Sequence, residues 1–248
     1  MSDMHERTRI LVGEDGLARL AAARVLVAGL GGVGGACAEA LCRAGIGHLT
    51  LLDHDTFAPS NLNRQLLATR DVLGRPKAEV AAERLRAIRP DLALCVRQTF
   101  LAPGDADDLV AGGGFDYVAD CIDSVACKAA LVLACQRHQV PAMTSLGAGG
   151  RIDVRQVRVG QLGAVEGCGL GRALRKRLRG EGGSLELPVV YSTEVPVPPL
   201  PHAPVGSGST AGRPRATNGT ISYLPNLFGM MVAGEIIRQL LSSGEEIA

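Results

Sequence analysis

A glycine-rich segment most constrains the fold of this chain: Gly29-Leu-Gly31-Gly32-Val-Gly34 lies between an apolar run, Arg24–Ala28, and a run with helical spacing, Val33–Ala44. Glycines between a strand and a helix permit a tight turn, and they let the backbone approach phosphate groups at the helix amino terminus. Asp53 follows the next apolar run, His48–Leu52, at about the spacing from which an acid bonds ribose hydroxyls. These residues predict a nucleotide-binding α/β fold, and on their own they fit ATP and NAD equally well.

Strand-like and helix-like runs alternate through the first two-thirds of the chain. This alternation predicts a Rossmann-like, doubly wound and mostly parallel sheet. Ligands of such sheets bind beyond the carboxyl ends of the strands, so we expect the functional residues there. The expected strands are 24–28, 48–52, 94–99, 116–121 and 140–145, and the expected helices are 33–44, 78–88, 105–111 and 128–138.

Beyond Gly150 the regular alternation of strand-like and helix-like runs ends. We expect an ATP-binding core over residues 1–158 and an extension of the same domain over 159–248, which adds strands and a terminal helix. Residues 152–159 alternate as a further strand would. The extension is expected to contain a basic helix at 170–179, a mobile loop at 196–215 that is rich in Pro, Gly and Ser, and the terminal helix at 221–241.

The segment after Asp53 distinguishes ATP from NAD. An enzyme that attacks a triphosphate needs cations where charge develops on phosphate oxygens, and an oxidoreductase has no such need. Arg64 offers a planar fork and Lys77 a point charge. The alternatives are that both are ordinary surface residues, or that the chain is a nicotinamide-binding oxidoreductase or sensor. The polar residues expected around the nucleotide are Asp53, Asp55, Ser60, Asn61, Asn63, Arg64, Gln65, Lys77, Asp123 and Ser124.

Acidic residues end the apolar run at 116–121. Asp123, at the carboxyl end of the expected strand, can hold Mg²⁺ between the phosphates and a second substrate. Asp120 ranks second for this role, because its carboxylate can instead bond nearby backbone.

Together, G-x-G-G-x-G, D-x-D, S-N-x-N-R-Q, a following lysine and the acid of Ile122-Asp123-Ser124 resemble the ubiquitin-activating enzyme superfamily. Bacterial members adenylate the carboxyl terminus of small sulfur-carrier proteins. The resemblance implies that Gly31 and Asp53 bind ATP, that Asp123 binds Mg²⁺, and that the phosphates meet Asn61, Arg64 and Lys77. It also implies a homodimer in which Arg9 reaches the ATP of the partner subunit; the alternative for Arg9 is a solvated charge near the chain start.

The cysteines bear on which member of the superfamily this is. Sulfur-carrier activators usually hold a structural zinc with two C-x-x-C pairs, whereas here Cys168 is the only cysteine after Cys135. Four thiolates cannot be assembled there, so we expect no structural zinc. Members that pass the acyl group on need a nucleophilic cysteine, and in the later part only Cys168 is available; its role stays open.

A substrate that cyclises after adenylation needs neither feature, and the chain resembles the tRNA threonylcarbamoyladenosine dehydratases. The similar segments are 44–47, 122–124 with 128–130, 147–153, 174–178, 190–194 and 219–225. The resemblance implies that ATP activates the threonyl carboxylate of a modified adenosine beside the anticodon, and that ring closure then releases AMP. Some of these enzymes carry a further cysteine near the last segment, linked to a sulfur-transfer partner; its absence here speaks against that partnership.

A basic segment supports an RNA substrate. Between residues 151 and 180 there are eight basic and two acidic residues, a local charge of +6, whereas the whole chain has a net charge of +1. Clustered cations bind RNA phosphates. We expect tRNA contacts from Arg172, Arg175, Lys176, Arg177 and Arg179. The alternative is an ordinary solvated helix face.

The chain start, Met1–Arg9, lacks an apolar signal-peptide core, which favours a cytoplasmic protein. The terminal apolar stretch is interrupted by Pro225, Glu235 and Arg238, which argues against a membrane span and leaves peripheral membrane contact open. The leading hypothesis is a tRNA-modifying dehydratase, and the alternative is an adenylyltransferase for a small sulfur-carrier protein.

Overall fold

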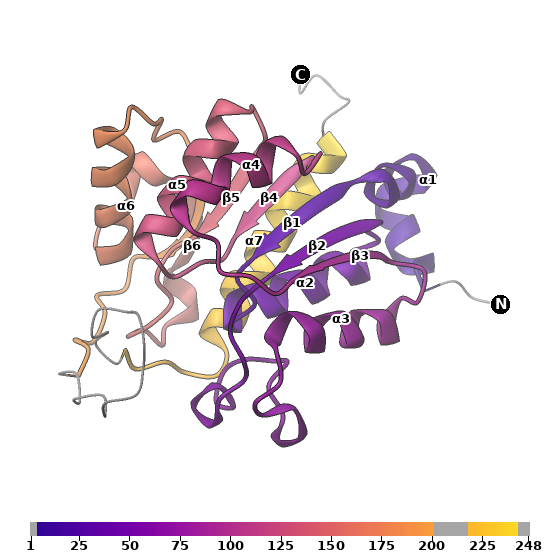
Figure 1. The fold of residues 1–248 in the computed structure, drawn as a ribbon, viewed down its shortest axis with the longest axis horizontal. Coiled ribbons are helices and arrows are strands. Elements are labelled where there is room, and N and C mark those ends of the chain that lie inside the picture. The colour runs from indigo at the N-terminus through magenta and orange to yellow at the C-terminus, as the bar shows by residue number, and fades with distance from the viewer. Residues whose placement is uncertain (1–3, 201–217, 243–248) are drawn as a thin grey trace.

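A seven-stranded sheet in the order β3-β2-β1-β4-β5-β7-β6 organises the computed structural model, which describes residues 4–200 and 218–242 (Figure 1). All neighbouring strands are parallel except β6 and β7. The predicted doubly wound, mostly parallel fold is therefore confirmed. The strands are β1 (Arg24–Ala28), β2 (His48–Leu52), β3 (Ala93–Arg97), β4 (Tyr117–Asp120), β5 (Ala142–Ser145), β6 (Val157–Gln161) and β7 (Pro188–Ser192).

Helices cover both faces of this sheet. Helices α1, α2, α3 and α7 pack on one face, and α4, α5 and α6 pack on the other (Figure 1). The helices are α1 (Glu6–Ala22), α2 (Gly32–Ala44), α3 (Lys77–Ile88), α4 (Ala106–Ala111), α5 (Val125–Arg137), α6 (Gly169–Gly180) and α7 (Leu224–Ser242). No helix among the described residues is long and apolar enough to cross a membrane.

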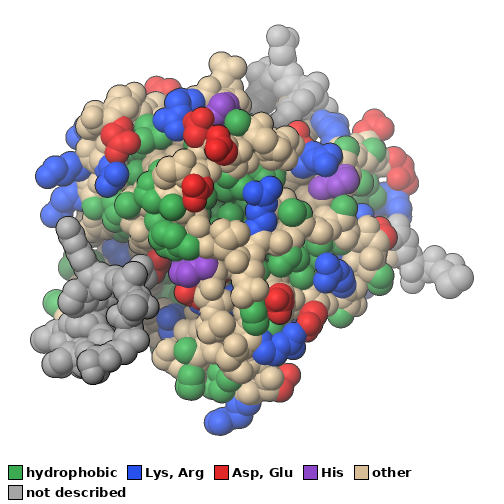
Figure 2. Space-filling view, in the orientation of Figure 1, with side chains coloured by type: hydrophobic (Ala, Val, Ile, Leu, Met, Phe, Trp, Pro, Cys, Tyr) green, Lys and Arg blue, Asp and Glu red, His purple; other side chains and the backbone are tan. Residues whose placement is uncertain are grey.

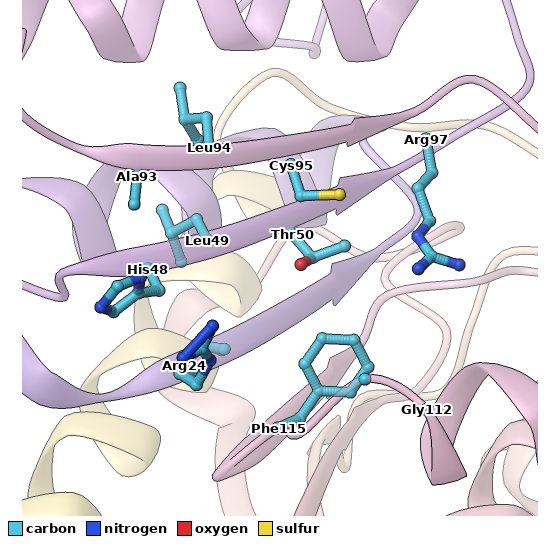
Figure 3. A pocket seen from close by; sticks show the side chains of 12 residues that line it. Arg24, His48, Leu49, Thr50, Ala93, Leu94, Cys95, Arg97, Gly112 and Phe115 are labelled. Carbon is cyan, nitrogen blue, oxygen red and sulfur yellow. The ribbon is translucent and has the colours of Figure 1, made fainter.

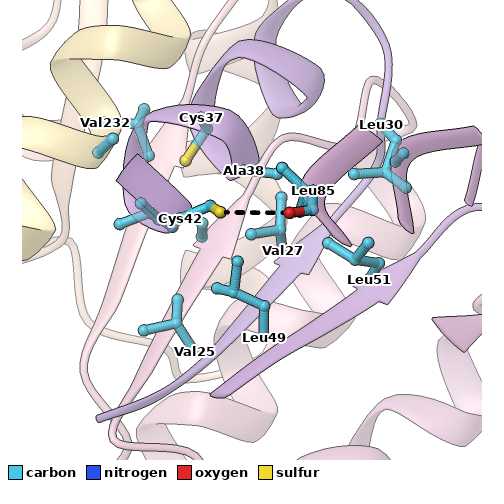
Figure 4. Packing of buried hydrophobic residues seen from close by; sticks show 14 of the residues in the cluster. Val25, Val27, Leu30, Cys37, Ala38, Cys42, Leu49, Leu51, Leu85 and Val232 are labelled. Carbon is cyan, nitrogen blue, oxygen red and sulfur yellow. Dashed lines mark hydrogen bonds between the residues drawn. The ribbon is translucent and has the colours of Figure 1, made fainter. Parts of the chain in front are cut away.

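The core follows the two-residue period of the strands. Val25 and Val27 of β1 face the layer that contains α2 and α7, whereas Leu26 and Ala28 face α5. Figure 4 shows the first layer, in which Cys42 Sγ donates to the carbonyl oxygen of Leu85 at 3.8 Å. The central strands β1 and β4 are buried over almost their whole length, as is usual for parallel strands covered on both faces. The edge strand β3 is only half-buried.

The structure departs from the predictions in three places. Helix α1 was not predicted; it is bent at Gly13, whose φ of 70° is not helical. The strand predicted at 152–159 is wrong in its first half, because Asp153 accepts a hydrogen bond from Arg155 N and caps a 3₁₀ turn at Val154–Gln156. Strand β7 was also not predicted, and it lies between β5 and β6.

Helix α7 brings the end of the chain back to the glycine-rich segment. It crosses α2 so closely that a Cβ at Gly229 would lie 2.1 Å from Val33 O, and one at Gly32 would lie 2.9 Å from Pro225 Cβ. The first turn of α7 therefore lies beside the first turn of α2. Residues 201–215 of the predicted mobile loop lie outside the described residues.

Candidate active site at the carboxyl edge of the sheet

The glycine-rich turn joins β1 to α2 at the carboxyl edge of the sheet. Gly29 has a φ of 87°, and its N–H donates to Leu52 O at 2.8 Å. A Cβ at Gly34 would lie 1.7 Å from Gly29 O, so the turn cannot form with a larger residue there. At Gly31 the nearest atom to such a Cβ is Gln65 Nε2 at 3.7 Å. Packing does not require a glycine at Gly31, and the space above it is open to a ligand.

Asp53 connects the end of β2 to this turn. Its buried carboxylate accepts from Leu30 N at 2.6 Å through Oδ2 and from Asp55 N at 2.8 Å through Oδ1. Each carboxylate oxygen can accept a second hydrogen bond. Asp53 is thus held rigidly and keeps acceptors for a ribose hydroxyl.

Lys77 begins α3 and reaches the same edge. Its Nζ donates to Asp55 Oδ2 at 3.0 Å, and its N–H donates to Asp55 O at 2.9 Å. The Lys77 side chain is 7% exposed and that of Asp55 is 53% exposed. An ammonium has three donors, and the described residues give this one a single side-chain partner, so two donors remain for an anion.

Arg64 lies in the segment between β2 and α3. Its Nη1 donates to Ser60 O at 2.8 Å and to Asn63 Oδ1 at 2.9 Å. Asn63 in turn donates to Thr220 O at 2.9 Å, and Asn226 Nδ2 donates to Arg64 O at 3.1 Å. Two hydrogen bonds therefore connect the Arg64 region to the segment that leads into α7.

Gln65 and Asn61 support the floor of the site. Asn61 is buried, and its Oδ1 accepts from Ala58 N at 3.1 Å, which closes the turn after Pro59. Gln65 is also buried, and its Oε1 has no hydrogen-bond partner among the described residues. A buried, unpartnered oxygen beside Gly31 is what a site completed by a bound polar ligand would contain.

Asp123 and Ser124 lie between β4 and α5. Asp123 is exposed, and Ser124 is the N-cap residue of α5. Within the described ranges, the one group of three potential metal ligands is Asp53, His54 and Asp55, and Asp123 is not part of it. The carboxylate of Asp123 is accessible at the predicted edge of the sheet.

A buried ion pair next to this edge was not predicted. Lys128 Nζ donates to Asp120 Oδ2 at 2.8 Å and to Ser145 O at 3.0 Å, and Thr144 Oγ1 donates to Asp120 Oδ2 at 3.0 Å. Both charged side chains are fully buried. Burial raises the pKa of the Asp120 carboxyl, against the opposing effects of Lys128 and Thr144. Asp120 Oδ1 also accepts from Ile122 N at 3.2 Å, which is the bond to nearby backbone named as the alternative to metal binding.

Arg9 lies far from the other predicted residues. Its N–H donates to His5 O, and His5 is next to Gly45 at the end of α2, so this part of α1 lies at the amino edge of the sheet (Figure 1). Arg9 Nε also pairs with Glu14 at 2.7 Å. Arg9 does not join the site of its own chain.

The basic residues of α6 divide into two groups. Arg175 turns inward and donates to Leu162 O at 3.2 Å and to Val165 O, and Arg177 pairs with Glu181 at 2.9 Å. Arg172, Lys176 and Arg179 are exposed. Figure 2 shows Lys and Arg side chains along the edge of the molecule that α6 forms.

Two hollows lie on the α5 side of the sheet. The larger, of about 400 Å³, lies over β1, β2 and β3 and is lined by Arg24, His48 and Cys95 among others (Figure 3). Its lining includes Arg24, His48 and Ala93, the first residues of β1, β2 and β3, so it reaches the amino edge of the sheet and we do not place the site there. The smaller, of about 220 Å³, is lined in part by Leu101 and by Leu52, the residue that precedes Asp53 at the end of β2.

The regions that match known proteins include all of the predicted site residues. The chain matches the ThiF family model over residues 5–248. It is 37% identical over 248 residues to tRNA threonylcarbamoyladenosine dehydratase of Escherichia coli (strain K12), which covers 95% of this chain and 92% of that protein. It superposes with a TM-score of 0.85 on a crystal structure of the E. coli dehydratase, TcdA, in complex with ATP, at 35% identity and with 98% and 95% of the two chains covered.

An adenylyltransferase matches over a shorter range. Molybdopterin-synthase adenylyltransferase of E. coli is 40% identical over 130 residues, which cover 52% of this chain and 51% of that protein. The similarity to the dehydratases spans both halves of the chain, so the resemblance predicted from the sequence is confirmed. The chain belongs to the ThiF family.

Proposed function

We propose that this protein uses ATP to adenylate the carboxylate of threonylcarbamoyladenosine in tRNA and so drives its cyclising dehydration. The observation that carries the proposal is the convergence of Gly31, Asp53, Arg64 and Lys77 at the carboxyl edge of the sheet. The near full-length similarity to proteins named tRNA threonylcarbamoyladenosine dehydratase supports the choice of substrate.

ATP binds across the glycine-rich turn in this proposal. Asp53 accepts from the ribose hydroxyls, and the adjoining hollow beside Leu52 and Leu101 takes the adenine. The phosphates lie over Gly31, at the first turns of α2 and α7, whose backbone N–H groups favour anions. Arg64 and Lys77 supply the cationic donors, and Gln65 directs its amide to the same place. Mg²⁺, held by Asp123, would neutralise phosphate charge.

The reaction proceeds in two steps. A carboxylate oxygen of the substrate attacks the α-phosphorus, the bond from that phosphorus to the bridging oxygen breaks, and pyrophosphate leaves. Lys77 and Arg64 stabilise the charge that develops on the phosphate oxygens. A nucleophile within the same substrate then attacks the acyl carbon, loses its proton and expels AMP. Because the attacking group is part of the substrate, its effective concentration is high and no enzyme nucleophile is needed.

Cys168 fits that scheme as a structural residue. It is buried, and its Sγ accepts from Gly171 N at 3.4 Å at the start of α6. We therefore assign it no acyl-transfer role, and we propose neither a structural zinc nor a sulfur-transfer partner.

A homodimer accounts for Arg9 in this proposal. Beside Arg9, Ile10 and Leu11 are 81% and 86% exposed, as is common for an apolar contact between subunits. Since Arg9 lies at the far edge from its own glycine-rich turn, it can serve only the ATP of the partner subunit. Mixing an Arg9→Ala variant with a Lys77→Ala variant should restore about one quarter of wild-type activity, because about half of the dimers would be mixed and each mixed dimer would hold one intact site of its two. No restoration would contradict the shared site.

The exposed cations of α6 bind the tRNA backbone in this scheme. Arg172, Lys176 and Arg179 contact phosphates directly, Arg177 is partly neutralised by Glu181, and Arg175 supports the helix from below. Such contacts make binding salt-dependent. We place the activity in the cytoplasm; contact of α7 with a membrane surface is not favoured, since α7 buries Phe228 and Val232 in the core.

The proposal is tested by AMP formation from ATP with tRNA that carries threonylcarbamoyladenosine and with tRNA that lacks it. Turnover with the modified tRNA alone supports the dehydratase. AMP formation that instead requires a small carrier protein with a free carboxyl terminus would favour the sulfur-carrier alternative, and tight binding of NAD without any AMP formation would favour a nicotinamide-binding protein.

A further inference from the structure

Tyr223 is unusual among the aromatic residues of this chain. The chain has four Phe, three Tyr and no Trp, all within the described ranges. Phe100 and Tyr223 are the two exposed members, at 53% and 44%. Phe100 packs edge-on against His54, with ring centroids 5.0 Å apart, whereas Tyr223 has no ring partner among the described residues. Tyr223 therefore presents an aromatic face that the fold does not use.

The Tyr223 ring is nevertheless fixed in place. Its hydroxyl donates to Ile152 O at 2.8 Å, and its carbonyl oxygen accepts from Leu227 N at 2.9 Å in the first turn of α7. Ile152 N is held in turn by the Glu194 carboxylate at 3.0 Å. A ring that is tethered at both ends loses little conformational entropy when a ligand binds to its face.

The segment that carries Tyr223 is attached to the phosphate-binding residues. Thr220 O accepts from Asn63, Asn226 donates to Arg64 O, and Pro225 packs against Gly32. Asp53 and the adenine hollow are at the end of β2, whereas Tyr223 precedes α7. The segment that carries the ring is thus held at the phosphate end of the proposed ATP site, the end at which a second substrate would approach.

The surroundings of Tyr223 suit a planar, weakly polar group. Ile152, whose carbonyl oxygen accepts from the Tyr223 hydroxyl, is 64% exposed, and Ile221, two residues before Tyr223 in sequence, is 37% exposed. Single-stranded RNA loops expose bases that stack on aromatic side chains, and such stacking accepts a base whose edge carries a bulky modification.

We propose that Tyr223 is the platform on which the modified adenine of the tRNA stacks, so that the attached carboxylate reaches the α-phosphate of ATP. This inference rests on the proposed function and adds to it the binding site of the reacting nucleoside. Tyr223 is a specificity residue in this scheme and takes no part in bond making.

Steady-state kinetics of Tyr223→Leu and Tyr223→Phe with modified tRNA test the platform. The Leu variant keeps apolar bulk and loses the ring, so its KM for modified tRNA should rise about tenfold while its KM for ATP stays within about twofold. The Phe variant keeps the ring and loses only the tether, and it should stay within about threefold of wild type in both. Met230→Ala, at a 45% exposed position of α7, is the matched control and should behave as wild type.

Three results would overturn the inference. An unchanged KM for tRNA in the Leu variant would show that the ring does not bind substrate. A Phe variant as impaired as the Leu variant would assign the effect to the Ile152 tether. If wild-type protein forms no AMP with modified tRNA, the proposed function fails first and the platform fails with it. Thermal unfolding of each variant separates loss of binding from loss of fold.

Discussion

Two lysine–aspartate pairs lie at the carboxyl edge of the sheet, and they differ in how far their side chains are exposed to solvent. Lys77 Nζ is 3.0 Å from Asp55, and Lys128 Nζ is 2.8 Å from Asp120. The second pair is fully buried, and Lys128 also donates to the carbonyl oxygens of Ser145 and Asp120. In the first pair Asp55 is 53% exposed, and the described residues give Lys77 one side-chain partner.

The difference shows that the distance within an ion pair does not decide its role. All three donors of Lys128 are used inside the protein, where it joins β4, β5 and α5. Lys77 has one side-chain partner among the described residues, and this partner, Asp55, is exposed and can be exchanged for a phosphate. We therefore assign Lys128 to the fold and Lys77 to the reaction.

The largest effect is expected from Lys128→Met. Removing one partner of a buried pair leaves an uncompensated charge, so the free energy of unfolding should fall by about 3–5 kcal/mol. Urea denaturation of this variant and of Lys77→Met measures the contrast, and the latter should lose about 1 kcal/mol or less because its partner is half in water. Equal losses in the two variants would contradict the comparison.

Lys77→Met should have the opposite pattern to Lys128→Met: a large loss of activity with little loss of stability. Loss of a preorganised donor to developing phosphate charge should lower kcat/KM for AMP formation by about 10²- to 10³-fold while the unfolding midpoint stays near that of wild type. Single-turnover kinetics with modified tRNA provide the measurement. Near wild-type turnover would remove Lys77 from the site, and Arg24→Gln, at an exposed position outside it, is the control.

The smallest effect concerns Glu39, a third acid with cationic partners. Burial raises the pKa of its carboxyl. Hydrogen bonds from Arg84 at 2.5 Å and from Arg43 together lower the pKa by more than burial raises it, so the net shift is downward. A depressed pKa adds stability above the unfolded value of about 4.3, and this stability is lost as the pH falls through the folded value. Glu39→Gln should therefore flatten the acid limb of stability against pH, and an unchanged limb would contradict this.

Much of this edge was predictable because its chemistry is local in sequence. The bounds of β1 and β2 follow from their apolar runs, and the glycine-rich turn with Asp53 follows from spacing that a strand and a helix impose. The alternation of strand-like and helix-like runs predicted a mostly parallel sheet, because parallel strands alternate with the helices that connect them.

The remainder depends on contacts between distant segments. The first turn of α7 contacts Gly32, although the two are about 190 residues apart in sequence. No local sequence pattern predicts this contact. The sequence contains one sign of the Asp120–Lys128 pair, which is a lysine inside the apolar helix Val125–Arg137. This lysine predicts a buried acidic partner only once β4 and α5 are known to be adjacent. Strand β6 began later than predicted because Asp153 caps a turn within an alternating run.

The most direct test of the central claim follows oxygen from the substrate carboxylate. Modified tRNA labelled with ¹⁸O in the threonyl carboxylate is incubated with ATP and wild-type protein, and AMP and pyrophosphate are analysed by mass spectrometry. Adenylation followed by ring closure predicts one labelled oxygen in AMP and none in pyrophosphate, with the nucleoside lighter by one labelled water. AMP without label would contradict activation of that carboxylate.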